Sequence, residues 1–201
     1  MLTLIGAITS PFVRKVRVLI QETGQEDDVE VVFIMPTPVS PDDQAMAANP
    51  TGKIPSLIRP DGPSLYDSRV ITRYLDARVD GGMYPDARLW ETLTLEATAD
   101  AIMDAGVLMV YEHRVRPEEM VFEGWIEAQW GKIDRAVTAI NERWMSHLHG
   151  PMDMSHIAVG CALGYLDFRQ PGRDWRAGAP ELATWFEEFG ARPSMQATKP
   201  E

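Results

Sequence analysis

The sequence predicts an α+β domain followed by an all-α domain. Two observations lead to this prediction. Strand-like apolar runs occur only in the first third of the chain, at residues 2–6, 29–34, 56–59 and 64–66. Beyond the breaker Asp80-Gly81-Gly82, the remaining periodic segments have helical spacing. We therefore expect an α+β domain over 1–80 and a helical domain over 87–201, with the boundary within 80–86.

The first domain should run strand, helix, strand, helix, strand, strand, helix (βαβαββα). Leu2–Ile5 is a buried strand ended by Gly6, and a hydroxyl residue before Pro11 is a helix-start signature for residues 11–23. Val29–Ile34 is the clearest strand after the first. The rest are a short helix at 41–47, strands at 56–59 and 64–66, and an amphipathic helix at 68–79.

The second domain should contain four helices. They are expected at 87–115, 117–147, 153–168 and 180–190, and the tail after Pro193 is expected to be irregular. Asp153 is a candidate cap of the third of these helices, with His156 three residues later able to contact the cap backbone as a neutral imidazole. We expect this pair to act on folding stability, not on catalysis.

Composition excludes several classes of function. The chain has 201 residues and a net charge of −11, which argues against binding nucleic acid or an anionic membrane through a general basic surface. No segment approaches the apolar length of a membrane span, and no signal peptide is recognisable. The single cysteine, Cys161, suits a reducing compartment and is expected to be buried and inert. The cytoplasm is therefore the expected location.

The first motif that carries chemistry is Thr9-Ser10-Pro11-Phe12. A hydroxyl at a helix N-terminus lies among free N–H groups and a partial positive charge, which together stabilise an anion such as a thiolate. Ser10 either only caps the helix or also donates a hydrogen bond to such an anion, and Thr9 is its competitor. The neighbouring basic group, Arg14, Lys15 and Arg17, is interpreted as a solvated helix face, with a local basic pocket as the alternative.

Two further motifs follow in order. Lys53-Ile54-Pro55 comes after the turn cluster Asn49–Gly52 and starts a strand. It is either a plain proline-started edge strand or, if Pro55 is cis, a segment whose Ile54 backbone pairs with an extended peptide ligand. Asp67-Ser68 opens a helix, where the two residues either cap it or bind the carboxylate and ammonium groups of a ligand.

Together these motifs resemble the glutathione site of serine-type glutathione S-transferases, whose N-terminal domain is thioredoxin-like. The resemblance extends over almost the whole chain. It implies that Ser10 hydrogen-bonds the glutathione thiolate and that Phe12 belongs to the same site. It further implies that Lys53 reaches the glycyl carboxylate, that Ile54 before a cis Pro55 pairs with the cysteinyl backbone, and that Asp67 and Ser68 hold the γ-glutamyl group. A serine at position 10 excludes the mixed-disulfide chemistry of the cysteine-type relatives.

The expected activity is conjugation of glutathione, the co-substrate, to hydrophobic electrophiles, as in detoxification. Peroxide reduction and dehalogenation would use the same site. In the family the electrophile lies against the first helices of the second domain, where Met103, Val107 and Tyr111 share one face, although core packing is the alternative. The resemblance also implies a homodimer. No metal site is expected, because His113, His147 and His149 lack ligand partners at a suitable spacing. The alternative function is a regulatory protein that binds glutathione or is catalytically silent.

Overall fold

The computed structural model describes residues 1–200, which fall into two compact units. The first unit runs from Met1 to Tyr84 and also includes the end of the chain from Ala197, and the second runs from Pro85 to Gln196. The step between Tyr84 and Pro85 lies inside the expected boundary of 80–86. The expected assignment of the whole tail to the helical domain differs from the structure, which groups the last residues with the first unit.

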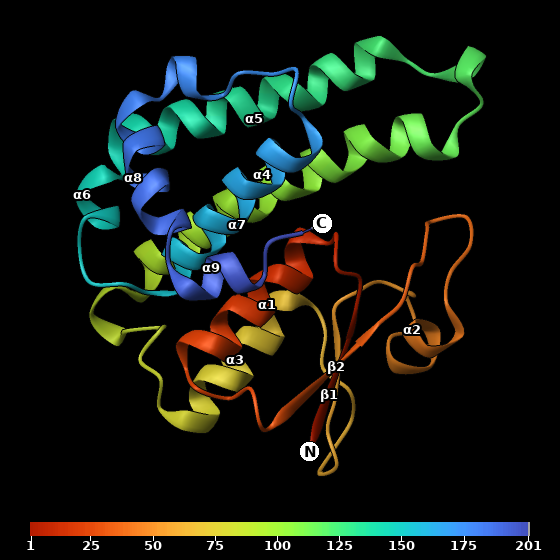
Figure 1. The fold of residues 1–201 in the computed structure, drawn as a ribbon, viewed down its shortest axis with the longest axis vertical. Coiled ribbons are helices and arrows are strands. Elements are labelled where there is room, and N and C mark those ends of the chain that lie inside the picture. Colours follow the sequence, from red (N-terminus) through yellow and green to blue (C-terminus); the bar gives the residue numbers. More distant parts are fainter. Residues whose placement is uncertain (201) are drawn as a thin grey trace. The chain divides into compact units, whose positions relative to one another are not determined.

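The first unit is built on a three-stranded mixed sheet in the order β2-β1-β3. Strand β1 (Leu2–Gly6) is parallel to β2 (Val29–Phe33) and antiparallel to β3 (Ser56–Ile58). Helices α1 (Pro11–Glu22) and α3 (Ser68–Val79) lie together on one face of the sheet, and the short α2 (Asp43–Ala48) lies on the other (Figure 1). The predicted α+β architecture is confirmed.

The predicted strand at 64–66 is reduced to a single bridge. Only Leu65 pairs with the sheet, through reciprocal 2.9 Å hydrogen bonds between its backbone and that of Leu57. The reason lies in the neighbouring residues. Pro63 supplies no N–H on one side, and on the other side Asp67 already adopts the N-cap conformation of α3, so only the three residues 64–66 lie between the turn and the helix cap.

The core of the first unit lies between the sheet and the pair α1 and α3. Its fully buried members come from all of these elements and include Leu4, Leu57, Leu19, Ile71 and Leu75. A second cluster on the other face holds α2 and contains Ile5, Ile34, Ala45 and Ala48. Burial of these apolar surfaces is the main driving force that fixes α1 and α3, whose N-termini begin at two of the predicted motifs.

The basic group on α1 is not a solvated face, as the sequence favoured. Arg14 is 7% exposed and Lys15 is fully buried. The Nε of Arg14 donates to the hydroxyl of Thr198, 3.5 Å away, so a buried arginine contacts the end of the chain. Arg17 is half-buried over the Phe33 ring, and its burial, together with the charge of Arg14, lowers its pKa. Charged residues at helical spacing therefore mark an interior face here, which composition alone does not reveal.

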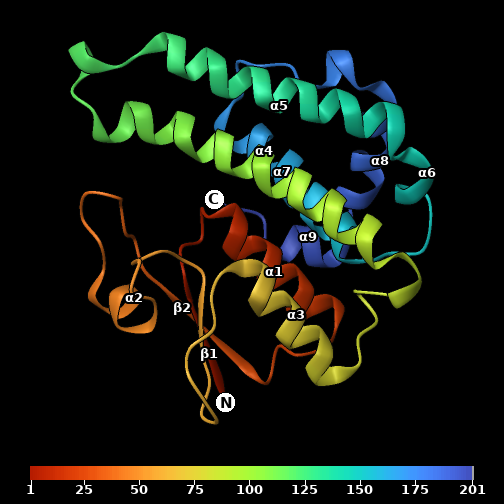
Figure 2. The same ribbon diagram turned by 180° about the vertical axis from the view of Figure 1, so that it is seen from behind.

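The second unit is all-helical, as predicted. The long helices α4 (Leu89–Val115) and α5 (Glu123–Arg143) run side by side in opposite directions, and α7 (Met154–Arg169) packs along α4 (Figure 2). Helix α7 is the centre of the core, since residues 157–159 and 161–163 are completely buried. The unit is completed by α6 (Met145–Leu148), α8 (Pro180–Gly190) and α9 (Pro193–Ala197). Within the described part of the chain, none of the helices has the length and apolar character needed to cross a membrane.

Two helix predictions in the second unit are wrong in extent. The helix expected at 117–147 begins only at Glu123, because Pro117 is followed by a 3₁₀ turn and by extended backbone at Val121 and Phe122. The same helix ends at Arg143, and α6 follows as a separate turn. The tail after Pro193, expected to be irregular, begins with α9, for which Pro193 is a suitable first residue.

Candidate functional site

Ser10 is the N-cap of α1 and lies just beyond the end of β1. Its backbone is extended, and its Oγ accepts a long hydrogen bond of 3.4 Å from the backbone N–H of Val13. Its own N–H donates to the carbonyl of Ala7 at 3.0 Å, which fixes the loop between strand and helix. Among residues 1–200, the Ser10 hydroxyl proton is donated to no partner. The hydroxyl is therefore held at a helix N-terminus with its donor unused.

The two neighbours of this cap occupy different positions. Thr9 precedes the cap, in the turn before the helix, and its hydroxyl does not contact the helix N–H groups. Phe12 is in the first turn of α1 and is partly buried. The structure thus gives the serine, and not the threonine, the position at the positive end of the helix.

The turn before β3 is organised by the side chain of Asn49, which is 3% exposed. Its Nδ2 donates to the carbonyl of Lys53 at 3.0 Å, and its Oδ1 accepts from the backbone and the hydroxyl of Thr51 at 3.0 and 2.9 Å. Gly52 takes the left-handed conformation that this turn requires, with φ of 65°. The result is that Lys53 is exposed, and its ammonium is unpaired within the described residues.

Ile54 and Pro55 follow this turn and are joined by a cis peptide bond. Among residues 1–200, neither the N–H nor the carbonyl of Ile54 is hydrogen-bonded, whereas Leu57 pairs with Leu65 further along. The first pairing of β3 with the sheet is Ser56 opposite Ile5. Ile54 therefore lies beside the end of β1 from which the Ser10 loop leaves.

Asp67 and Ser68 open α3. Asp67 is its N-cap and accepts from the N–H of Arg69 at 3.1 Å, while its second oxygen pairs with the Arg69 guanidinium at 3.3 Å. The carboxylate is exposed, but Ser68 is only 2% exposed. The bond between Tyr66 and Asp67 is a second cis peptide. Since Leu65 pairs with Leu57, α3 begins on the same side of the sheet edge as the other two motifs.

The three residues predicted to contact an electrophile lie on one stripe of α4. Met103 is fully buried, while Val107 and Tyr111 are partly exposed. Met103 therefore packs in the core, which was the alternative interpretation for this group of residues. The stripe becomes accessible only toward the C-terminal half of the helix.

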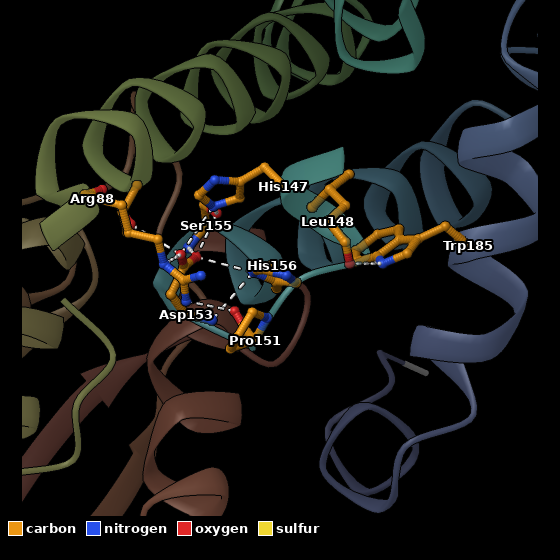
Figure 3. A network of polar contacts seen from close by, with 9 residues as sticks. Arg88, His147, Leu148, Pro151, Asp153, Ser155, His156 and Trp185 are labelled. Atoms are coloured by element: carbon orange, nitrogen blue, oxygen red, sulfur yellow. Dashed lines mark hydrogen bonds and ion pairs between the residues drawn. The ribbon is translucent and has the colours of Figure 1, made fainter. Parts of the chain in front are cut away.

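A buried polar network surrounds the N-terminus of α7 (Figure 3). Asp153 is fully buried and caps the helix, and its Oδ1 accepts from the N–H and the hydroxyl of Ser155 at 3.0 and 2.6 Å. Its Oδ2 accepts from the Thr92 hydroxyl at 3.0 Å and lies 3.3 Å from Nε of Arg88 and 2.9 Å from Nε2 of His147. Burial favours the neutral acid, but the bonds from His156 and Ser155 outweigh it and hold the pKa of Asp153 well below its usual range.

The predicted contact of His156 with the cap backbone is present. The Asp153 N–H donates to Nδ1 of His156 at 3.2 Å, and the same nitrogen lies 3.0 Å from Asp153 Oδ1. Nδ1 cannot accept a hydrogen bond from the backbone and donate one to the carboxylate at the same time. The neutral ring with its proton on Nε2 accepts from the backbone, whereas a proton on Nδ1 is donated to the carboxylate. Nε2 of His156 is buried and has no partner in the described residues.

The expectation that His147 has no carboxylate neighbour is wrong. Ligand atoms of His147, Asp153 and His156 lie within 4.8 Å of one another, a geometry that a metal ion requires. The carboxylate is already saturated with donors, however, and the Arg88 guanidinium brings a positive charge to the same oxygen as His147. These contacts fit a helix cap better than a cation site. The partners Arg88 and Thr92 are more than sixty residues distant from Asp153, and no local sequence signal marks them.

A mixed sheet covered by helices, with a cis proline before β3 and a helical second unit, is the architecture of thioredoxin-like proteins that carry a helical second domain. Models of two domains match this chain: the glutathione S-transferase N-terminal domain over residues 9–78 and the glutathione S-transferase C-terminal domain over residues 123–188. The chain belongs to the glutathione S-transferase family.

Individual relatives cover almost the whole chain. It is 34% identical, over 98% of both chains, to YibF of Escherichia coli K12, described as an uncharacterized GST-like protein. A glutathione transferase family member from Pseudomonas fluorescens Pf-5, solved with bound glutathione, is 45% identical over the full length of both chains with a TM-score of 0.97. A structure from Methylobacillus flagellatus, also with glutathione, is 36% identical over the full length of both, with a TM-score of 0.89.

Proposed function

We propose that this protein is a glutathione transferase that ionises the glutathione thiol at Ser10 and conjugates it to hydrophobic electrophiles. The observation that carries the proposal is the unused hydroxyl proton of Ser10 at the N-terminus of α1. A thiolate there would receive one charge-assisted hydrogen bond, worth about 1.5–3 kcal/mol, and a helix-dipole contribution of about 0.3–1 kcal/mol. Together they match the roughly 3 kcal/mol needed to lower a thiol pKa by about two units.

The remaining groups suit the rest of glutathione. In this proposal the unpaired Ile54 backbone pairs with the cysteinyl residue as an added strand, and the Lys53 ammonium binds the glycyl carboxylate. Asp67, which keeps an exposed carboxylate, binds the γ-glutamyl ammonium, with Ser68 beside it and Phe12 at the thiol end. Two relatives solved with bound glutathione support glutathione as the ligand.

The electrophile is proposed to contact Val107 and Tyr111 on α4, over the buried Met103. One structure of the Pseudomonas fluorescens relative, 44% identical with a TM-score of 0.92, was solved with S-(propanoic acid)-glutathione. A thioether of that kind is what conjugation would produce.

We further propose a cytoplasmic homodimer. The end of β2 and the segment that leads to α2 expose apolar side chains, with Phe33 48%, Met35 90% and Val39 73% exposed. Such clustering supports an interface between copies. A sedimentation measurement in which the protein remains a monomer at micromolar concentration would contradict the dimer.

The function is tested by following thiolate absorbance while glutathione is titrated with the protein from acid to alkaline pH. We expect the bound thiol to ionise at lower pH than free glutathione, and turnover of a chlorodinitrobenzene to follow the same pH profile. Binding without a shift in thiol ionisation would favour the glutathione-binding, catalytically silent alternative. Absence of binding would contradict the glutathione site altogether.

Lys53→Ala is expected to weaken glutathione binding about fivefold, because it removes one solvent-exposed ion pair worth up to about 1 kcal/mol. Turnover at saturating glutathione should not change, since the lysine lies away from the thiol in the proposed pose. Isothermal calorimetry and steady-state kinetics measure the two effects. Lys132→Ala removes an exposed lysine of α5 and is the matched control. Equal losses in both variants would contradict the role given to Lys53.

A further inference from the structure

Two arginines at the C-terminal ends of α4 and α7 lack an acidic partner. Arg114 is exposed in the last turn of α4, and Arg169 is the last residue of α7. In residues 1–200 neither forms an ion pair with a carboxylate. Other arginines of this unit do so: Arg116 pairs with Glu112, Arg173 with Glu127 and Arg176 with Asp167.

Two tyrosines lie beside these arginines. Tyr111 is three residues before Arg114 on α4, and Tyr165 is four residues before Arg169 on α7, so each pair shares one helix face. The two helices run side by side (Figures 1 and 2) and approach closely at Gly106. A Cβ added at Gly106 would lie 3.2 Å from the Tyr165 ring. Thr92 near the start of α4 also contacts Asp153 at the start of α7, at 3.0 Å, so the two helices run in the same direction and their C-terminal ends, with Arg114 and Arg169, lie near each other.

The hydrogen bonds of this cluster leave donors available. Arg169 rests over the Phe168 ring, with its guanidinium carbon 4.1 Å from the ring centroid. Burial raises the pKa of Tyr165 to about 12, so the phenol keeps its proton at neutral pH. The nearest carboxylate along α4, Glu112, is already occupied by Arg116 and by the N–H of Phe122. The two guanidinium groups and the two tyrosine hydroxyls of this cluster therefore have no carboxylate partner among the described residues.

We propose that Tyr111, Arg114, Tyr165 and Arg169 form a carboxylate-binding subsite that selects anionic electrophiles over neutral ones. The inference rests on the proposed transferase function, since it assigns a substrate class to the electrophile site that includes Tyr111. Planar guanidinium groups bind carboxylates through paired, charge-assisted hydrogen bonds, and tyrosine hydroxyls add neutral donors.

The selectivity can be measured with two matched aryl chlorides. Both carry chlorine ortho to a nitro group, with either a carboxylate or a carboxamide para to the chlorine. In each reaction the thiolate sulfur forms a bond to the ring carbon and chloride leaves with the electron pair of the broken C–Cl bond. No other reactant is needed. Each kcat/KM is divided by the uncatalysed rate constant, which removes the difference in intrinsic reactivity between the two rings.

The wild-type protein should favour the carboxylate about tenfold after this correction. Arg114→Gln and Arg169→Gln should each lower the value for the carboxylate by about fivefold to tenfold and leave the carboxamide within about twofold. Arg114→Lys, which keeps the charge, should recover part of the loss. Arg135→Gln removes an exposed arginine of α5 that is also unpaired in the described residues, and serves as the matched control.

Equal losses on both substrates, or no preference in the wild type, would overturn the subsite. A binding experiment separates this failure from failure of the proposed function. Calorimetry compares S-carboxyethylglutathione with S-propylglutathione, and the carboxylate should bind about tenfold more tightly only while both arginines are present. If neither chloride is turned over but this difference persists, the transferase proposal fails and the subsite stands. If both thioethers bind equally, the subsite is refuted whatever the turnover.

Discussion

Ser10→Ala is expected to lower kcat for conjugation by about 10-fold to 150-fold, the equivalent of one charge-assisted hydrogen bond. The loss should fall on turnover more than on glutathione affinity, because the peptide groups of the ligand are held by other residues in the proposed site. The bound thiol should also lose most of its lowered pKa. Absorbance titration of the thiolate and single-turnover kinetics measure the two effects separately.

A structural effect of the same substitution has to be distinguished. Ser10 also caps α1, so alanine should cost about 1 kcal/mol of stability, although the long cap bond of 3.4 Å suggests a smaller value. Thermal unfolding measures this cost. Thr9→Val is the matched control, because it removes the neighbouring hydroxyl that precedes the cap. A thiol shift that survives in Ser10→Ala and disappears in Thr9→Val would transfer the role to the threonine.

Asp153→Ala is expected to destabilise the protein by about 3–5 kcal/mol, the usual cost of removing one partner from a buried ionic network. The alanine leaves Arg88, Thr92 and the N–H of Ser155 without their acceptor in the interior. Urea unfolding monitored by tryptophan fluorescence gives the difference in free energy. Asp42→Ala, which removes a solvent-exposed cap bond of the short helix α2, should cost only about 1 kcal/mol. Similar losses in the two variants would contradict the network.

The charge of Asp153 should also make the free energy of unfolding depend on pH. Its pKa is lowered in the folded protein, so its contribution is complete above the ordinary carboxyl pKa of about 4. The contribution declines as the pH falls from there toward the lower folded value. Asp153→Asn keeps a cap acceptor but removes the charge, so its deficit in unfolding free energy should be largest near neutral pH and shrink below about pH 4. A deficit that grows in acid would contradict this sign.

The elements that the sequence predicts well are those with local signals. The start of α1 is marked by Pro11 after Ser10, and the hydrophobic faces of α1 and α3 are marked by the spacing of their apolar residues. The structure gives both helices within one residue of the expected bounds. The strand at 64–66 is overestimated because its neighbours Pro63 and Asp67 already belong to a turn and a cap. The helix expected from 117 is overestimated because a proline can begin a 3₁₀ turn as well as an α-helix.

The features that escape prediction depend on contacts between distant residues. The sequence around Asn49 indicates only a turn. It does not indicate that the side-chain amide of Asn49 donates a hydrogen bond to the carbonyl of Lys53. Charge alone suggests a solvated surface for Lys15, whereas the fold buries it. The carboxylate of Asp153 and the ring of His147 meet only because α6 returns the chain toward the start of α7. The local sequence pattern does not predict such contacts between distant residues.

The contact between Arg14 and Thr198 has a consequence for how the protein is made. Residues 1–84 leave the ribosome early and contain every strand of the sheet, yet the hydroxyl that accepts from Arg14 lies 184 residues further along the chain. An excised fragment ending at Tyr84 would therefore bear a buried guanidinium deprived of this acceptor. During translation the first unit therefore attains this contact only after the second unit has been synthesised.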